Sequence, residues 1–200
     1  AGRVEALSLH AGIWTSAALA APPMQVPRLR QQMGELAARF GFDPGGHAGK
    51  ALVHALTALP HDIVISFDDA DLERTATTMM SLVDRPRPRL VLVAAPLARH
   101  LFVFVWLPRE TISTATRMQI QTLVEQGCDA PMLDWSLEVE GTLGLLRFVL
   151  DLKVDATIPA EADLDAQLQA LVRGWVDAVE AEIARQEDPA RAAALAARYA

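Results

Sequence analysis

The segment Pro44-Gly-Gly-His-Ala-Gly-Lys50 is the nearest approach in this sequence to a phosphate-binding loop. A true loop follows the pattern G-x-x-x-x-G-K-[ST], in which backbone N–H groups cradle phosphate and the last hydroxyl binds Mg²⁺. Pro44 stands where the first glycine is needed, and Ala51 stands where the hydroxyl is needed. No strand is predicted before the segment either. We therefore interpret it as a loop followed by the start of a helix.

Other residue types that could support catalysis or metal binding lack their usual context. His47 and His54 are two helical turns apart, but a zinc site needs further Cys, Asp or Glu ligands, and His61 with Asp62 supplies few. The serines occur in no G-x-S-x-G turn, so Ser113 is better explained as a helix cap. No G-x-G-x-x-G dinucleotide fingerprint is present. We expect no catalytic, cofactor-binding or metal-binding residue in this chain.

Acidic and aromatic residues are explained by structure. The acidic cluster comprises Asp68, Asp69, Asp71 and Glu73, at the predicted start of a helix. The helix dipole favours negative charge there, so a cap is preferred over an acid/base pair. The tryptophans lie in separate predicted elements, and such residues ordinarily pack in a core rather than stack on a ligand; they are Trp14, Trp106, Trp135 and Trp175.

Composition bounds the class of protein. The 200 residues suffice for one or two domains, and the net charge of −7 argues against binding to nucleic acid. The basic run Arg85-Pro-Arg-Pro-Arg89 is better explained as the exposed entrance to a strand. Cys128 is the only cysteine, which excludes an internal disulfide and fits a reducing cytoplasm. No apolar run is long enough to span a membrane. The apolar share of 52% suggests a surface that another structure covers.

The elements that position these residues are predicted from periodicity, prolines and caps. Strands are predicted for Val4–Trp14 and for residues 62–67, 90–94, 101–107, 132–140 and 145–154. Helices are predicted for residues 27–40, 47–59, 69–83, 113–126 and 163–186 and after Pro189, with Gly127 ending the fourth. Residues 62–140 then follow the order βαββαβ, which is ferredoxin-like and ACT-like. The predicted fold class is α+β: an ACT-like antiparallel sheet with an extra strand and flanking helices.

Three segments follow from this order. Residues 1–60 form an N-terminal strand and a helical linker, 61–158 the ACT-like domain, and 159–200 a C-terminal helical segment. The chain enters an apolar segment at once, without an initiator methionine, and stops inside a helix-like tail. We therefore expect a piece of a longer protein, in which the neighbours of the N-terminal strand lie outside this chain.

Several motifs resemble the N-terminal half of the large bacterial NAD-specific glutamate dehydrogenases. Thr15-Ser-Ala-Ala-Leu and Val26-Pro-Arg-Leu-Arg30 resemble the family pattern FTSxAY…IPLLRRK. Gly46-His-Ala-Gly-Lys-Ala-Leu52 with Leu59-Pro-His-Asp62 resembles HDGKAL…FPRDELFQ. The resemblance continues through RPRVRLFV…VYVPRDxYNT and a late W-x-D, matched here by Arg85-Pro-Arg-Pro-Arg-Leu90, Val105-Trp-Leu-Pro-Arg-Glu110, Ser113-Thr114 and Trp175-Val176-Asp177.

This resemblance implies a multidomain cytoplasmic homo-oligomer that deaminates L-glutamate to 2-oxoglutarate with NAD. Its catalytic and NAD-binding parts lie C-terminal to this region, so no catalytic residue is carried over. The resemblance places this chain among the ACT-like domains and their connecting helices, with other domains and subunits of the enzyme as partners.

Two functions are compatible with such a segment. In the favoured one, the domain packs against other parts of the enzyme and supports its assembly. In the alternative, it is an allosteric sensor that binds an amino-acid effector, as many ACT domains do. The loop Phe67-Asp-Asp-Ala-Asp71 lacks the glycine that such sites usually use, and it would oppose a carboxylate. If an effector does bind, we expect Asp69, Asp71 and Arg99 to contact it.

Overall fold

The computed structural model describes residues 3–13, 15–43, 45–96, 99–153, 156–173 and 182–199. The chain divides into two compact units, Ala1–Met80 and Ser81–Ala200. The division differs from the predicted segments, because residues 61–80 belong to the first unit. Pro44, Trp14 and the Trp175-Val176-Asp177 motif lie outside the described residues.

The first unit is helical. Its elements are α1 (Ser16–Leu19), the 3₁₀ helix η1 (Pro23–Gln25), α2 (Pro27–Phe40), α3 (His47–Thr57), α4 (His61–Val64) and most of α5 (Asp69–Val83). The predicted proline start of α2 is confirmed, and Gly41 ends this helix with a φ of 67°. The predicted acidic cap is also confirmed, because the Asp68 carboxylate accepts the Asp71 N–H at 2.8 Å.

One predicted strand is wrong, and another is unpaired within the described residues. Residues 62–67, predicted as the first strand of the sheet, lie in α4 and the turn after it. Ile63, Val64 and Phe67 are all buried there, and a short apolar run does not distinguish a strand from a buried helical turn. The described residues of the other segment, 4–13, form neither helix nor strand.

The second unit contains an antiparallel sheet of four strands in the order β1-β2-β4-β3. The strands are β1 (Arg89–Ala94), β2 (His100–Pro108), β3 (Met132–Glu140) and β4 (Leu143–Asp151). The helices are η2 (Arg109–Thr111), α6 (Thr114–Cys128), α7 (Glu161–Val172) and α9 (Pro189–Tyr199). The α+β class with its antiparallel sheet and flanking helices is confirmed.

The order of elements in the sheet differs from the prediction. From β1 to α7 it is ββαββα, and moving β4 and α7 to the front gives βαββαβ. The strand predicted as an addition is thus β4, which pairs with both β2 and β3 inside the sheet. It takes the central place that the order βαββαβ would give to a first strand.

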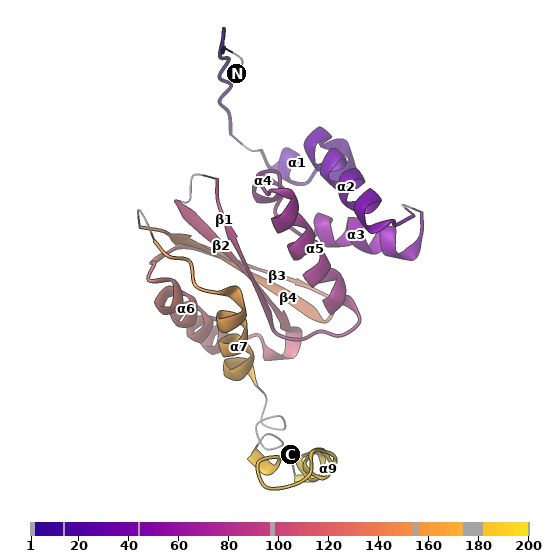
Figure 1. The fold of residues 1–200 in the computed structure, drawn as a ribbon, viewed down its shortest axis with the longest axis vertical. Coiled ribbons are helices and arrows are strands. Elements are labelled where there is room, and N and C mark those ends of the chain that lie inside the picture. The colour runs from indigo at the N-terminus through magenta and orange to yellow at the C-terminus, as the bar shows by residue number, and fades with distance from the viewer. Residues whose placement is uncertain are drawn as a thin grey trace. The chain divides into compact units, whose positions relative to one another are not determined.

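Helices α6 and α7 cover one face of the sheet (Figure 1). The core between them consists of buried apolar residues from all of these elements, among them Leu90, Val103, Val105, Ile120, Val124, Leu146, Phe148, Leu164 and Leu168. Gly127 does not end α6, contrary to prediction; Asp129 does, with a φ of 46°. Gly127 instead permits close packing, since a Cβ there would lie 2.5 Å from Leu164 Cδ2. Among the described helices, none is long and apolar enough to cross a bilayer.

Candidate interaction surface at the sheet edges

The edge of the sheet at β1 is closed by side chains of α7. Asp165 Oδ1 accepts the Leu90 N–H at 2.7 Å, and Glu161 Oε2 accepts the Leu92 N–H at 2.8 Å. These two acidic residues are four apart, so they lie on one face of the helix. They occupy backbone N–H groups that an added strand would otherwise use. The β1 edge is therefore not available for pairing at these positions.

Asp165 is the centre of this closure. Its carboxylate also accepts from Arg89 Nη1 at 2.8 Å and from Gln169 Nε2 at 2.7 Å. The side chain is only 9% exposed, whereas that of Arg89 is 38% exposed. A buried charge needs such partners, because desolvation without them is costly. Asp165 thus joins α7 to the start of β1 by a hydrogen bond from the Leu90 backbone and by an ion pair with Arg89.

The opposite edge, at β3, is open. Within the described residues no strand pairs with β3 on the side away from β4. Its large apolar side chains are exposed by 39–54%: Leu133, Trp135, Leu137 and Val139. Register places three of them on the face that α6 and α7 cover, since Trp135 pairs with Phe148, Leu137 with Leu146 and Val139 with Gly144. We call these four residues with the outer β3 backbone the β3 edge.

Side chains of α6 hold the start of β3 in place. Glu125 Oε1 accepts the Met132 N–H at 2.9 Å. The Arg117 guanidinium lies 4.5 Å from the centroid of the Trp135 ring, and its Nη1 donates to Gln121 Oε1 at 2.8 Å. This contact orients the indole along the margin of the sheet. The β3 edge is therefore an ordered apolar strip.

The other face of β3 is polar. It carries Asp134, Ser136 and Glu138, which alternate with the apolar residues. Arg147 on β4 donates from Nε to Ser136 Oγ at 3.2 Å and lies 3.5 Å from the Asp134 carboxylate. The alternation of one apolar and one polar face is that of a strand at the margin of a core.

The residues predicted to contact an effector belong to different units. In the first unit, Asp69 pairs with Arg39 at 2.8 Å and Asp71 pairs with Arg74 at 2.5 Å. The hydrogen bonds that the Arg39 guanidinium donates to Glu73 and Asp69 raise its pKa. Arg99 belongs to the second unit, where its carbonyl accepts the Leu152 N–H at 2.9 Å. Neither unit contains all three residues, and both aspartates already have cationic partners.

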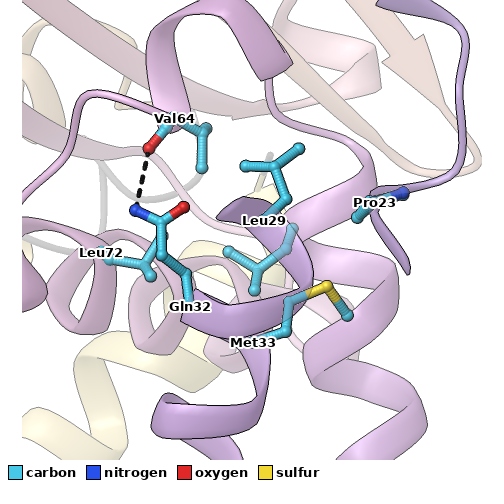
Figure 2. A pocket seen from close by; sticks show the side chains of 7 residues that line it. Pro23, Leu29, Gln32, Met33, Val64 and Leu72 are labelled. Atoms are coloured by element: carbon cyan, nitrogen blue, oxygen red, sulfur yellow. Dashed lines mark hydrogen bonds between the residues drawn. The ribbon is translucent and has the colours of Figure 1, made fainter. Parts of the chain in front are cut away.

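A small cavity lies within the first unit (Figure 2). Gln32 Nε2 donates there to the carbonyls of Val64 and Phe67 at 3.4 and 3.3 Å, while its Oε1 has no partner among the described residues. The space of about 10 Å³ is near the minimum for one water molecule. It is lined by Pro23, Leu29, Gln32, Met33, Leu56, Val64 and Leu72. A water hydrogen-bonded to Gln32 fits this space, and an amino acid does not.

Metal-binding and nucleophilic groups do not gather in the described part of the chain. No three His, Cys, Asp or Glu side chains there are placed to hold a metal ion. Cys128 is buried in the core, and burial raises the pKa of its thiol to about 11. Such a thiol stays protonated at neutral pH and is a poor nucleophile.

Glu161 and Asp165 were not predicted as functional residues. The only signal was two acidic residues four apart near the start of the helix after Pro159, a spacing equally typical of a solvated face. The apolar positions of β3 were recognised, because Leu133, Trp135, Leu137 and Val139 alternate. Their place at an open edge depends on the strand order, which a local pattern does not contain.

Comparisons with known proteins agree with the two units. The family model for glutamate dehydrogenase helical motif 1 matches residues 26–85, and that for the glutamate dehydrogenase ACT2 domain matches residues 89–176. The chain is 29% identical over 180 residues to the NAD-specific glutamate dehydrogenase of Halomonas elongata and 28% identical over 178 residues to that of Pseudomonas aeruginosa. It is 24% identical over 142 residues to that of Mycobacterium tuberculosis.

These alignments cover most of this chain and little of the relatives. The first two each include 88% of the chain but only 11% of the relative, and the third includes 70% and 9%. The family matches occur in chain order and coincide with the helical unit and the sheet unit. The chain therefore carries a helical motif and an ACT2 domain of the glutamate dehydrogenase family.

Proposed function

We propose that this chain is a non-catalytic assembly segment of a large NAD-dependent glutamate dehydrogenase. In the full-length protein, the β3 edge docks against another domain of the same enzyme. That enzyme converts L-glutamate and NAD to 2-oxoglutarate, ammonia and NADH in the cytoplasm, as a homo-oligomer. The relatives are named NAD-specific glutamate dehydrogenases, which supports this reaction, and the small share of their length that the chain spans supports a partial role.

The open β3 edge is the observation that carries the proposal. Nine residues of edge strand with four exposed apolar side chains would promote aggregation if they stayed uncovered. The opposite edge of the same sheet is closed by α7, so the fold excludes pairing on one side only. Addition of a strand to an open sheet edge is a common mode of protein recognition. In the full-length enzyme, segments of other domains can pair with this edge.

Leu137→Lys in the full-length enzyme tests the proposal. The lysine places a charge in the contact, and the matched control is Ile158→Lys, because Leu137 and Ile158 are exposed by 39% and 37%. We expect Leu137→Lys to lower the thermal midpoint of the assembled enzyme and to dissociate part of it in sedimentation, with loss of glutamate-dependent NADH formation. Ile158→Lys leaves all three unchanged. Equal behaviour of the two variants contradicts the proposal.

The alternative, an amino-acid sensor, has a separate test. The two acidic residues proposed for it are paired with Arg39 and Arg74, and the cavity of the helical unit is too small for an amino acid. Titration calorimetry of this chain with amino acids, 2-oxoglutarate and NAD separates the two functions. The assembly role predicts no saturable heat, whereas binding that Asp69→Ala abolishes would establish a sensor.

A further inference from the structure

The N-terminal segment has the pattern of a strand but pairs with nothing in the described chain. From Leu7 to Ile13 the sequence is Leu-Ser-Leu-His-Ala-Gly-Ile, with an apolar residue at every second position. Residues 3–13 precede α1 as an extended chain without helix or strand (Figure 1). This alternation is typical of a strand with one buried face.

The two sides of the segment differ in chemistry. Ser8 Oγ lies 3.0 Å from His10 Nε2, so these two polar side chains share one side of the extended backbone. Leu7, Leu9 and Ile13 occupy the alternate positions and are each about nine-tenths exposed. Val4, nearer the start, is 81% exposed. A side with three large, uncovered apolar residues and an opposite side with a polar pair is an amphipathic strand that lacks a sheet.

We infer that residues 7–13 are a strand that pairs with the edge of a sheet elsewhere in the same polypeptide. Leu7, Leu9 and Ile13 enter the apolar layer of that sheet, and Ser8 and His10 face water. Relatives are about nine times as long as the aligned region, so the polypeptide has ample chain to supply such a sheet. The inference shares with the proposed function only the premise that this chain works inside a larger enzyme, because it concerns other residues.

Two cysteine variants at neighbouring positions, one on each side of the segment, test this inference. Leu9→Cys places a thiol on the apolar side and Ser8→Cys places one on the polar side, one residue away. Peptide-resolved alkylation compares each thiol in this 200-residue chain and in the full-length enzyme. In the short chain we expect both to react at rates within about twofold of each other. In the full-length enzyme we expect Leu9→Cys to react at least tenfold more slowly, with Ser8→Cys nearly unchanged.

Equal reactivity of Leu9→Cys in both proteins would overturn the inference. Because that substitution could itself weaken docking, hydrogen exchange at residues 7–13 of the unmodified enzyme provides a second readout, and we expect protection that the short chain lacks. Protection that appears in the short chain, together with dimer formation, would instead identify a second copy as the partner and contradict our choice. Exchange at residues 132–140, read in the same experiment, reports on the proposed function independently.

Discussion

The two edge strands of the sheet, β1 and β3, differ in what occupies their outer sides. At β1, two carboxylates of α7 accept backbone N–H groups of Leu90 and Leu92, and a partly buried ion pair between Arg89 and Asp165 holds the helix. At β3, the described chain supplies no second strand, and four apolar side chains remain exposed. The difference teaches that one fold can exclude pairing on one side and leave it open on the other.

Sequence chemistry explains how each edge is specified. Closing β1 requires acidic residues on the side of α7 that faces the strand. Asp165 there accepts hydrogen bonds from three donors, an arrangement that a fully solvated helix would not need. Leaving β3 open requires the absence of such a helix and of a gatekeeper charge on its apolar side. Covering an edge with a helix, as at β1, is one of the usual protections against aggregation, whereas β3 carries charged residues only on its polar face.

Asp165→Ala should have the largest effect. Loss of the carboxylate leaves the buried Leu90 N–H without its acceptor and Arg89 without its partner, so the sheet unit should lose about 2–3 kcal/mol of unfolding free energy. Urea denaturation followed by circular dichroism measures this loss. Asp163→Ala, on an exposed side of α7, is the control and should cost about 0.5 kcal/mol or less. A similar cost for both would refute the closure of β1.

Gly127→Ala should have the next largest effect. The added Cβ would meet Leu164 of α7, so the helix that closes β1 must shift, at a net cost of about 1–2 kcal/mol after the gain in helix propensity. Gly34→Ala in α2 is the matched control, because nothing lies within 4 Å of its new Cβ, and it should gain about 0.5–1 kcal/mol. Thermal denaturation of both variants checks the opposite signs. A stabilised Gly127→Ala would show that α7 does not need this close contact.

Arg117→Met should have a smaller effect. It removes the cation from the Trp135 ring and the bond to Gln121, at about 0.5–1 kcal/mol. Because it frees the indole, it should also change the fluorescence of that tryptophan. Arg109→Met, at an exposed arginine of η2, serves as the control and should change neither quantity. An unchanged spectrum for Arg117→Met would argue that Trp135 is positioned by the strand alone.

Leu137→Lys should have the smallest effect on the isolated chain. Its side chain is already substantially exposed, so the unfolding free energy should change by about 0.5 kcal/mol or less. Light scattering on warming should nevertheless decrease, since a lysine on an edge strand opposes edge-to-edge association. A large loss of stability would place Leu137 in the core and remove the basis for an open edge.

Much of the local structure was predictable from the residues themselves. Pro27 marks the start of α2, Ser113 caps α6 by accepting the Thr116 N–H at 3.0 Å, and the alternation of residues 132–140 identifies β3. These signals act within a few residues, so no knowledge of the rest of the chain is needed. The α+β class follows from them.

The arrangement of the elements was less predictable. The apolar residues Ile63, Val64 and Phe67 are equally compatible with a strand and with a buried helical turn. In the structure, the carbonyls of Val64 and Phe67 accept hydrogen bonds from Gln32 of α2, which lies more than 30 positions earlier in the sequence. Gly127 was predicted to end α6 because glycine is common at helix ends. The structure instead shows that Leu164, 37 positions later in the sequence, packs too closely against Gly127 to leave room for a side chain. The structural role of Asp165 likewise depends on its hydrogen bonds with Leu90 and Arg89. Each error arose where a partner far along the chain decided the outcome.

Hydrogen exchange on β3 and β1, compared between this chain and the full-length enzyme, tests directly whether another part of the enzyme covers the β3 edge. We expect the amides of residues 132–140 to gain protection of at least about tenfold in the full-length enzyme. Amides of Leu90 and Leu92, already bonded to α7, change little. Unchanged exchange along β3 in the full-length enzyme would mean that the edge stays uncovered, and it would contradict the proposed assembly role.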